Sequence, residues 1–384
     1  MSLNNTETLT ESVLSKPINA EKLTISDLDN LQIHFIFSTG RSGSTLLPFI
    51  LQMHDHVSMA SEEYFAVSLA PKYEHIKNWT KDIIHQYAND FILFSDGKLF
   101  PLFAGKDFMI ALLSQFQEHL TYERVIKLSY LCFASNKDLT QLKVVIDKQL
   151  RYYLLKEYIR LFPNSKFIFL CRDARDNIYS KYNKALRKKR KPTTCWDIYT
   201  WLYTYKEYLK YPQIKQQSFL LQYEKLIQHP ESTLHELSEF LNIEYTPHFL
   251  DYYLQAELIF NSIQNPKVKE HFSIMHKSLT QPINPEKIDE WRKNMHRPEI
   301  KNLCDTTWKI TEKANSAFGY IAHDNYDSNT KSTPCIIERL KIKLSLLVSR
   351  SYFSYTPFFI RRFIKLKLYK HRINKNTIFD AYLR

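Results

Sequence analysis

Residues 38–47, STGRSGSTLL, combine two glycines, small hydroxyl side chains and one arginine directly after the apolar run IHFIFS. Backbone N–H groups of such a loop can converge on a phosphate when the loop leads into a helix. The guanidinium of Arg41 offers a planar fork for phosphate or sulfate oxygens, and Ser44 and Thr45 can donate hydroxyl protons. The segment is therefore predicted to bind an anion.

The loop differs from a triphosphate-binding loop in one position. Such a loop places a lysine on the β- and γ-phosphates, and here that position holds Ser44. Metal-assisted kinase chemistry is therefore disfavoured, and a monophosphate or a phosphosulfate is the better ligand. A short glycine loop alone is weak evidence, because a plain strand-to-helix turn can have a similar sequence.

A second candidate binding element lies in KFIFLCRDARDNIYSKY, residues 166–182. The first seven residues predict a buried strand, and the following residues predict a helix with acids early and bases late, which suits the helix dipole. Arg172 ends the strand, and Ser180 follows eight residues later, about two turns into the helix. Open α/β folds bind ligands at the carboxyl ends of their strands, so this pair suits a second phosphate group.

The remaining pattern indicates which elements position these residues. IHFIFS (33–38) and VVID (144–147) predict further short strands. A helix is expected to start in TLLPFILQM, where Pro48 is tolerable only near the beginning, and YYLLKEYIRLF (152–162) predicts an amphipathic helix. Residues 64–140 are expected to form helices on the substrate side. Strands that alternate with helices predict an α/β fold with a P-loop-like open parallel sheet flanked by helices.

Charge and composition divide the 384-residue chain. Its 44% hydrophobic content is that of a globular protein, and its net charge of +13 suggests an anionic partner. We expect a polar N-terminal arm over residues 1–30, one large domain over 31–330, and a basic aromatic C-terminal extension over 331–384. Residues 335–384 hold 12 Lys or Arg and two acids, which gives +10 of the +13.

The expected environment is cytoplasmic and reducing. The five cysteines are scattered, odd in number and without a C-x-x-C pair, which argues against a disulfide framework or a zinc site. No signal-peptide pattern or long apolar span is present. The extension mixes bases with Phe, Tyr, Ile and Leu, so two interpretations fit it. It is a helical addition packed on the core, the favoured interpretation, or it makes peripheral contact with an anionic membrane.

At this point the sequence resembles a family, the sulfotransferases that use 3′-phosphoadenosine 5′-phosphosulfate (PAPS). GRSGSTLL resembles their 5′-phosphosulfate loop, and FIFLCRDARDNIYSKY resembles their 3′-phosphate motif. The resemblance covers about residues 33–322 and continues through IDK, LFPNSKF, LLQYEKLIQHPESTL, PINPEKIDEWRKN and AFGY. Bacterial sulfotransferases and the tyrosyl-protein sulfotransferase branch share this layout.

The resemblance implies a donor, PAPS as co-substrate without a metal, and a set of site residues. Lys148, in VVIDKQL, matches a lysine that helps to stabilise the transferring group in the tyrosyl-protein branch, and Arg41 would also neutralise charge there. Tyr223, in LLQYEKL, matches a tyrosine near the adenine. The implied cofactor-binding residues are Gly40, Arg41, Ser42, Gly43, Ser44, Thr45, Arg172, Ser180 and Tyr223.

The resemblance also implies a glutamate base just beyond the helix of the loop, where HVSMASEEYF supplies Glu62 and Glu63. Gap-free counting favours Glu62, but relatives have Gly-Glu-Glu where this chain has Ala-Ser-Glu, so the choice between the two acids stays open. Some sulfotransferases use a histidine base, which makes His54 and His56 further candidates, although HDHV reads more simply as a solvated turn.

Structural interpretations compete at several of these positions. Lys148 could be a solvated lysine beside Asp147, Arg172 could pair with Asp173 or Asp176, and Tyr223 could be a core tyrosine. Arg175 is interpreted as structural, because it lacks the motif position.

The predicted reaction is in-line transfer of the sulfonyl group from PAPS to a hydroxyl or amine of a glycan, lipid or small metabolite. The basic run RKKRK (187–191), and with less weight Lys277, could attract the nucleotide or an acidic acceptor or simply be solvated. Two alternatives are a P-loop kinase-like phosphotransferase and a basic nucleic-acid-binding protein. The second lacks a helix-turn-helix, zinc-finger or RNA-recognition signature.

Overall fold

A five-stranded parallel sheet forms the centre of the molecule, with strand order β2-β3-β1-β4-β5. The computed structural model describes residues 17–61, 64–95, 103–134, 137–262, 277–324, 326–327 and 336–373. The strands are β1 (Gln32–Ser38), β2 (Val57–Ser61), β3 (Val144–Gln149), β4 (Phe167–Cys171) and β5 (Ser218–Gln222).

Side chains on alternate strand positions enter different cores, because successive residues of a strand point to opposite faces. Phe35 and Phe37 of β1 join one hydrophobic cluster, and Ile36 between them joins another. The central strands are buried along nearly their whole length, as expected for a parallel sheet covered on both faces.

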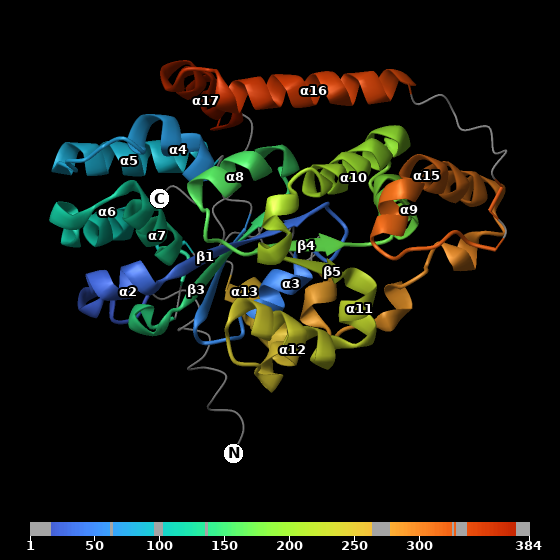
Figure 1. The fold of residues 1–384 in the computed structure, drawn as a ribbon, viewed down its shortest axis with the longest axis horizontal. Coiled ribbons are helices and arrows are strands. Elements are labelled where there is room, and N and C mark those ends of the chain that lie inside the picture. Colours follow the sequence, from blue (N-terminus) through green and yellow to red (C-terminus); the bar gives the residue numbers. More distant parts are fainter. Residues whose placement is uncertain are drawn as a thin grey trace.

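Helices cover both faces of this sheet (Figure 1). One face packs against α4 to α8, the other against α3 and α11 to α13, and a third cluster joins α9, α10 and α15 beyond β4. The α-helices are α2 (Ile25–Asn30), α3 (Leu46–Leu51), α4 (Phe65–Tyr73), α5 (Lys81–Phe94), α6 (Lys106–Gln115), α7 (Tyr122–Leu131), α8 (Leu155–Leu161), α9 (Ala174–Arg187), α10 (Thr194–Leu209), α11 (Tyr223–Gln228), α12 (Pro230–Leu241), α13 (Tyr252–Ser262), α15 (Pro298–Ala317), α16 (Ile336–Ser354) and α17 (Phe358–Ile373).

The predicted α/β class and open parallel sheet are confirmed, as are the strands at 33–38 and 144–147 and the helix after Arg172. The helix predicted over 152–162 is a 3-10 turn, Tyr152–Leu154, followed by α8. Strands β2 and β5 were not predicted. They form the two edges of the sheet.

The last two helices lie as a separate layer over the molecule, α16 beside α10 and α17 beside α5 (Figure 1). The packed helical extension is therefore what the described residues show. In the part of the chain that the structure describes, no helix is both long and apolar enough to cross a membrane.

The cysteines depart from expectation at one position. Cys132, Cys171 and Cys304 are buried free thiols. Cys195 is disulfide-bonded, which the scattered spacing did not indicate.

Candidate active site

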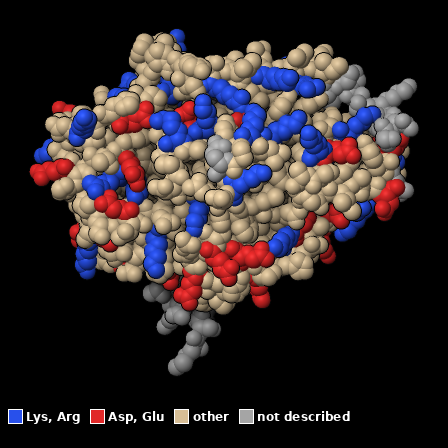
Figure 2. Space-filling model, viewed as in Figure 1, with Lys and Arg blue, Asp and Glu red and all other residues tan. Residues whose placement is uncertain are grey.

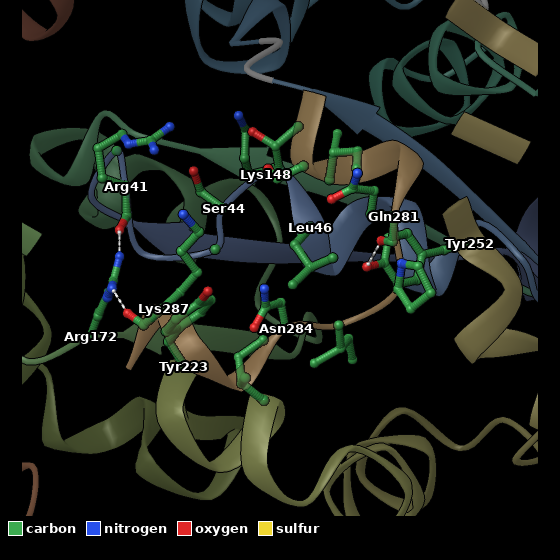
Figure 3. Close-up of a pocket in the computed structure, with 18 of the residues that line it drawn as sticks. Arg41, Ser44, Leu46, Lys148, Arg172, Tyr223, Tyr252, Gln281, Asn284 and Lys287 are labelled. Carbon is green, nitrogen blue, oxygen red and sulfur yellow. Dashed lines mark hydrogen bonds between the residues drawn. The ribbon is translucent and has the colours of Figure 1, made fainter. Parts of the chain in front are cut away.

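A cavity of about 310 Å³ lies at the carboxyl edge of the sheet (Figure 3). Its wall comes from the loop after β1 and the start of α3, the ends of β3 and β4, helix α9, the starts of α11 and α13, and a segment that begins at the 3-10 turn Lys277–Thr280. The polar and charged side chains that line it are Arg41, Ser44, Thr45, Lys148, Arg172, Lys184, Tyr223, Tyr252, Ser278, Gln281, Asn284 and Lys287.

Backbone conformation shapes the loop after β1. Gly43 has φ +81°, and a Cβ at this position would lie 2.6 Å from Cδ2 of Tyr223. Only glycine fits, because any side chain would meet both a strained backbone and the tyrosine ring. Arg41 also has a left-handed backbone, with φ 73°, which is uncommon for a residue with a side chain. The loop thus turns tightly against Tyr223 and enters α3.

Ser42 anchors the loop from behind. Its side chain is fully buried and is not among the described residues that line the cavity. Asn177 of α9 donates its amide to Oγ of Ser42 at 2.9 Å and to the carbonyl oxygen of Gly40 at 2.9 Å. The hydroxyl of Thr39 lies 2.9 Å from that of Ser42. Asn177 is a positioning residue that the sequence analysis missed, although it lies within the quoted motif.

Arg41 connects the two predicted phosphate motifs. Its Nε donates to Oγ of Ser180 at 3.2 Å, across 139 residues of sequence. The carbonyl oxygen of Arg41 accepts a hydrogen bond from Arg172 at 3.2 Å. Desolvation, and then the nearby positive charges of Arg172 and Arg187, lower the pKa of Arg41. The concentration of positive charge around Arg41 favours the binding of an anion.

Arg172 is buried and holds three parts of the site together. Besides Arg41, it donates to the carbonyl oxygen of Lys287 at 2.6 Å, and its guanidinium lies 4.7 Å from the ring centre of Tyr223 (Figure 3). The alternative ion pair exists in part, since Asp176 lies 3.7 Å away. Among the described residues, Nε of Arg172 has no hydrogen-bond partner.

Asp176, in the first turn of α9, is a buried carboxyl with a shifted titration. Burial raises the pKa of Asp176 to about 7, against the opposing effect of Arg172. The backbone N–H of Asp289 donates to this carboxyl at 2.9 Å. The contact joins α9 to the segment after the 3-10 turn Lys277–Thr280, which closes one side of the cavity.

Arg175 has the structural environment that the sequence analysis expected. Its side chain is buried and pairs with Asp173 at 2.5 Å. The guanidinium lies 4.5 Å from the ring centre of Trp291 and 4.4 Å from that of Trp308. Asp173 is therefore engaged with Arg175 and not with Arg172.

Lys148 lines the cavity and is buried, so the solvated alternative is wrong. Its neighbour Asp147 is bound elsewhere, since Tyr130 donates to that carboxylate at 2.7 Å and Gln149 at 2.6 Å. Tyr223 also lines the cavity, and burial raises its pKa.

Six polar residues of the wall were not predicted from the sequence: Lys184, Tyr252, Ser278, Gln281, Asn284 and Lys287. Lys184 lies on α9, one turn after Ser180, and its pKa is lowered by burial and then by Arg41. Tyr252 donates its hydroxyl to the carbonyl oxygen of Gln281 at 2.7 Å, and burial raises its pKa to about 12. Asn284 and Lys287 come from PINPEKIDEWRKN, which was quoted for its resemblance but given no site role.

The candidate bases divide by position. Glu62 and Glu63 lie outside the described residues, as does the side chain of Lys277. His54 and His56 are described but do not belong to the cavity wall as far as the structure describes it. Nδ1 of His54 accepts from the backbone N–H of His56 at 3.0 Å, so the pair forms a turn before β2. The turn is not solvated at His54, because that side chain is buried.

The basic run 187–191 is exposed where α9 ends. Its side chains are not part of the cavity wall in the described structure, whereas Lys184, just before the run, is.

An open parallel sheet with a glycine loop and a basic cavity at its carboxyl edge is the arrangement of α/β phosphate-binding proteins. The sulfotransferase family model matches residues 34–247, more than half of the chain. The chain therefore belongs to the sulfotransferase family, and sulfotransferase activity follows from that membership. This decides against the kinase-like and nucleic-acid-binding alternatives.

Several solved structures are similar to this chain. The sulfotransferase domain from the Synechococcus PCC 7002 olefin synthase is 18% identical, with a TM-score of 0.46, over 77% of this chain and 97% of that one. The sulfotransferase domain from the curacin biosynthetic pathway is 18% identical, with a TM-score of 0.49, over 76% and 99%. Sulfotransferase STF9 from Mycobacterium avium is 10% identical, with a TM-score of 0.38, over 79% of each chain.

No curated protein matches the sequence. The family model supports the sulfotransferase family, and none of these findings supports the tyrosyl-protein branch that the sequence resembles. Among the described residues, no three His, Cys, Asp or Glu side chains are grouped so that they could hold a metal ion.

Proposed function

We propose that the sulfonyl donor is PAPS and that it binds in the cavity at the carboxyl edge of the sheet. One observation carries the proposal: Arg41, Lys148, Arg172 and Tyr223 come from four separate parts of the sequence and line one cavity. Two βα junctions supply the two anion-binding devices that a 3′,5′-bisphosphate nucleotide needs.

The 5′-phosphosulfate would lie against residues 40–45. Ser44 and Thr45 line the cavity, and the hydroxyl of each can donate a proton to the ligand. Gly43 allows the backbone to approach Tyr223 closely, and Ser42 would act from behind by holding the loop. The backbone N–H groups of this loop would bind phosphate oxygens.

The 3′-phosphate would lie near Arg172 and Ser180, with Tyr223 beside the adenine. The unpartnered Nε of Arg172 fits this assignment, because a buried donor of a charged group is costly without an acceptor. Lys184 and Lys287 add positive charge to the same wall.

During transfer, Arg41 and Lys148 would stabilise negative charge on the sulfonyl oxygens and the leaving oxygen, the electrostatic effect that usually dominates such reactions. Glu62 would accept the proton of the attacking hydroxyl or amine. Its position in the chain supports this role, since Ser61 pairs with Lys148 in the sheet and Glu62 is the next residue.

We propose a glycan, lipid or small metabolite as acceptor, bound beside the apolar part of the wall, which includes Leu46, Leu150 and Ile283. In this proposal residues 31–330 form the catalytic domain, residues 1–30 an N-terminal arm and residues 331–384 an extension. A cytoplasmic location stays a prediction that cell fractionation can test.

The decisive test is incubation of the protein with isotopically labelled PAPS and an extract of host metabolites and glycans, followed by mass spectrometry. Products heavier by one sulfonyl group, absent when PAPS is omitted, would support the proposal. Matched incubation of Lys148→Met, which keeps a long side chain but removes its charge, should give far less product. Transfer that is equally fast from another sulfonyl donor would contradict PAPS as the donor.

A further inference from the structure

The outer face of the C-terminal helices exposes an unusual amount of apolar surface. Twelve of the nineteen large apolar side chains exposed in the described structure lie between residues 336 and 368. Monomeric soluble proteins rarely expose apolar side chains in such a concentration, and contiguous patches of this kind mark interaction sites.

In α16 these side chains follow one face of the helix. They recur at intervals of one, three or four residues, which keeps them within one arc of the helix, and each is 60–64% exposed: Ile336, Ile337, Leu340, Leu344, Leu347 and Val348. The opposite face is fixed to the protein. Ile342 and Phe353 are buried, and Arg350 pairs with Glu207 of α10 at 2.7 Å. The orientation of α16 is therefore set by its inner side.

Helix α17 repeats the arrangement. Its inner side holds the buried Arg361, and Arg362 pairs with the buried Asp90 of α5 at 2.8 Å. Its outer side exposes 37–72% of each of five apolar side chains: Phe359, Ile360, Phe363, Ile364 and Leu368. We call the outer sides of the two helices together the C-terminal face.

Positive charge borders this face. Residues 336–373 contain ten Lys or Arg and one acid, Glu338. Lys341 and Lys343 of α16 and Lys367 of α17 are exposed beside the apolar side chains, whereas the guanidinium of Arg339 lies toward α10, 6.0 Å from the ring centre of Tyr199. At the upper edge of the molecule in Figure 2, where Figure 1 places α16 and α17, blue side chains interrupt a largely uncharged surface.

We propose that the C-terminal face docks on an anionic lipid surface. A helix with an apolar arc between basic side chains lies in the plane of a membrane interface, with the arc among the acyl chains and the bases at the headgroups. The charge argues against a second copy of the chain as the partner, because a symmetric contact would place like charges together. Packing of the extension on the core, which the sequence favours, is compatible with membrane contact, since packing uses only the inner sides of the two helices.

Sedimentation with lipid vesicles tests the proposal on the full-length protein. We expect binding to mixed phosphatidylcholine–phosphatidylglycerol vesicles and little to pure phosphatidylcholine. Binding should weaken as salt rises from about 0.05 to about 0.5 M, because salt screens the charge contribution. No binding of the parent protein to the anionic vesicles would overturn the proposal without any variant.

Charge variants separate docking from general basicity. Removing three charges from the face, with Lys341→Gln, Lys343→Gln and Lys367→Gln, should weaken binding roughly 100-fold. The control removes three exposed lysines elsewhere, with Lys143→Gln, Lys215→Gln and Lys313→Gln, and has the same net charge. Equal loss in both triple variants would refute a defined face.

Apolar variants test the other half of the surface. Leu340→Ser, Leu344→Ser and Phe363→Ser together should weaken vesicle binding roughly tenfold or more, because less apolar surface enters the bilayer. The control Leu254→Ser with Ile321→Ser changes exposed apolar side chains elsewhere and should bind as the parent does. If the parent is a dimer that the triple variant converts to a monomer, the face is a contact between copies and the membrane proposal is wrong.

Discussion

Arg41 and Ser180 show how individual side chains of the two motifs depend on each other. The left-handed backbone of Arg41 directs its guanidinium toward α9, where Nε donates to Ser180. The hydroxyl of Ser180 therefore has two roles in the proposed complex. It holds Arg41, and it can donate its own proton to a phosphate oxygen.

At Ser180 we predict a selective loss of nucleotide affinity. Ser180→Ala should weaken binding of adenosine 3′,5′-bisphosphate by roughly tenfold or more, since a hydrogen bond to a charged group contributes about 1.5–3 kcal/mol. Affinity for adenosine 5′-monophosphate, measured by calorimetry in parallel, should stay close to that of the parent. If both nucleotides lose affinity equally, Ser180 acts through the orientation of Arg41 and not on the 3′-phosphate.

Arg172→Ala should have a larger effect than Ser180→Ala. It removes the guanidinium beside Tyr223 and also the two hydrogen bonds that join the carbonyls of Arg41 and Lys287. We expect the same selectivity for the 3′-phosphate together with a lower melting temperature. Lys184 lines the same cavity but does not make those backbone contacts, so Lys184→Ala is the matched control for the melting temperature. A melting temperature unchanged by Arg172→Ala would contradict the linking role.

The proposed base gives a prediction about rate and not about binding. Glu62→Gln keeps the size of the side chain but cannot accept a proton, so kcat should fall by about 10²-fold or more. Affinity for the donor nucleotide and the melting temperature should stay close to those of the parent. Glu63→Gln is the matched control and should be mild. The reverse pattern would assign the base to Glu63, and near-normal rates in both variants would remove both glutamates.

At the scale of elements, the first turn of α9 organises the site. Asn177 holds the loop after β1, and Asp176 binds the backbone of Asp289 in the closing segment. The two neighbours thus position two parts of the site from one helix, the loop after β1 and the segment that contains Asp289. A change of charge in this turn should therefore change the stability of the whole site.

The titration of Asp176 predicts how stability depends on pH. Burial raises its pKa from the ordinary 3.8 to about 7 in the folded protein. The stability that this carboxyl contributes is therefore complete below the unfolded pKa and is lost as the pH rises through about 7. Between about pH 5 and about pH 8, the melting temperature of Asp176→Asn should decline less than that of the parent. The melting temperature of the control Asp82→Asn, at an exposed acid of α5, should change with pH as that of the parent does. If the melting temperature of Asp176→Asn also changes with pH as that of the parent does, the raised pKa of Asp176 is contradicted.

Local sequence predicted the central elements and not the edge strands, for a physical reason. Strands β1, β3 and β4 are apolar because both of their faces are buried, so IHFIFS, VVID and KFIFLC are recognisable. β5 is partly exposed at one edge, and β2 at the other is the short VSMAS, so neither has such a run.

The residues of the site likewise fall into those that local sequence predicted and those that it did not. Residues within contiguous motifs, such as Arg41 and Arg172, were found because spacing along the chain reflects their geometry. Tyr252 reaches the cavity only through the tertiary fold, and the segment of Asn284 was recognised by its resemblance without an indication of which of its side chains enters the cavity. Ser42 was predicted to bind the cofactor, but its hydrogen bonds to Thr39 and Asn177 behind the loop explain its place in the motif. It has no place in the cavity wall as far as the structure describes it.

At the scale of the molecule, the cavity lies where separately packed parts meet. Leu46 and Tyr223 belong with the cluster under α3, α11 and α12, whereas Arg172 follows Cys171 of the cluster around α9, α10 and α15. A ligand that contacts both motifs would connect these two clusters. Such a ligand should stabilise the folded protein as a whole.

We therefore predict that adenosine 3′,5′-bisphosphate raises the melting temperature without added metal. At a concentration of 100 times Kd the stabilisation is about 2.7 kcal/mol, which corresponds to a shift of several degrees. ATP with Mg²⁺ should do much less, because Ser44 replaces the lysine that a triphosphate loop needs and ATP lacks a 3′-phosphate. Differential scanning fluorimetry with both nucleotides, on the parent and on Arg172→Ala, measures the difference. Equal stabilisation of the parent by the two nucleotides would contradict the assignment of two phosphate sites, since only one of the ligands has a group for the second site.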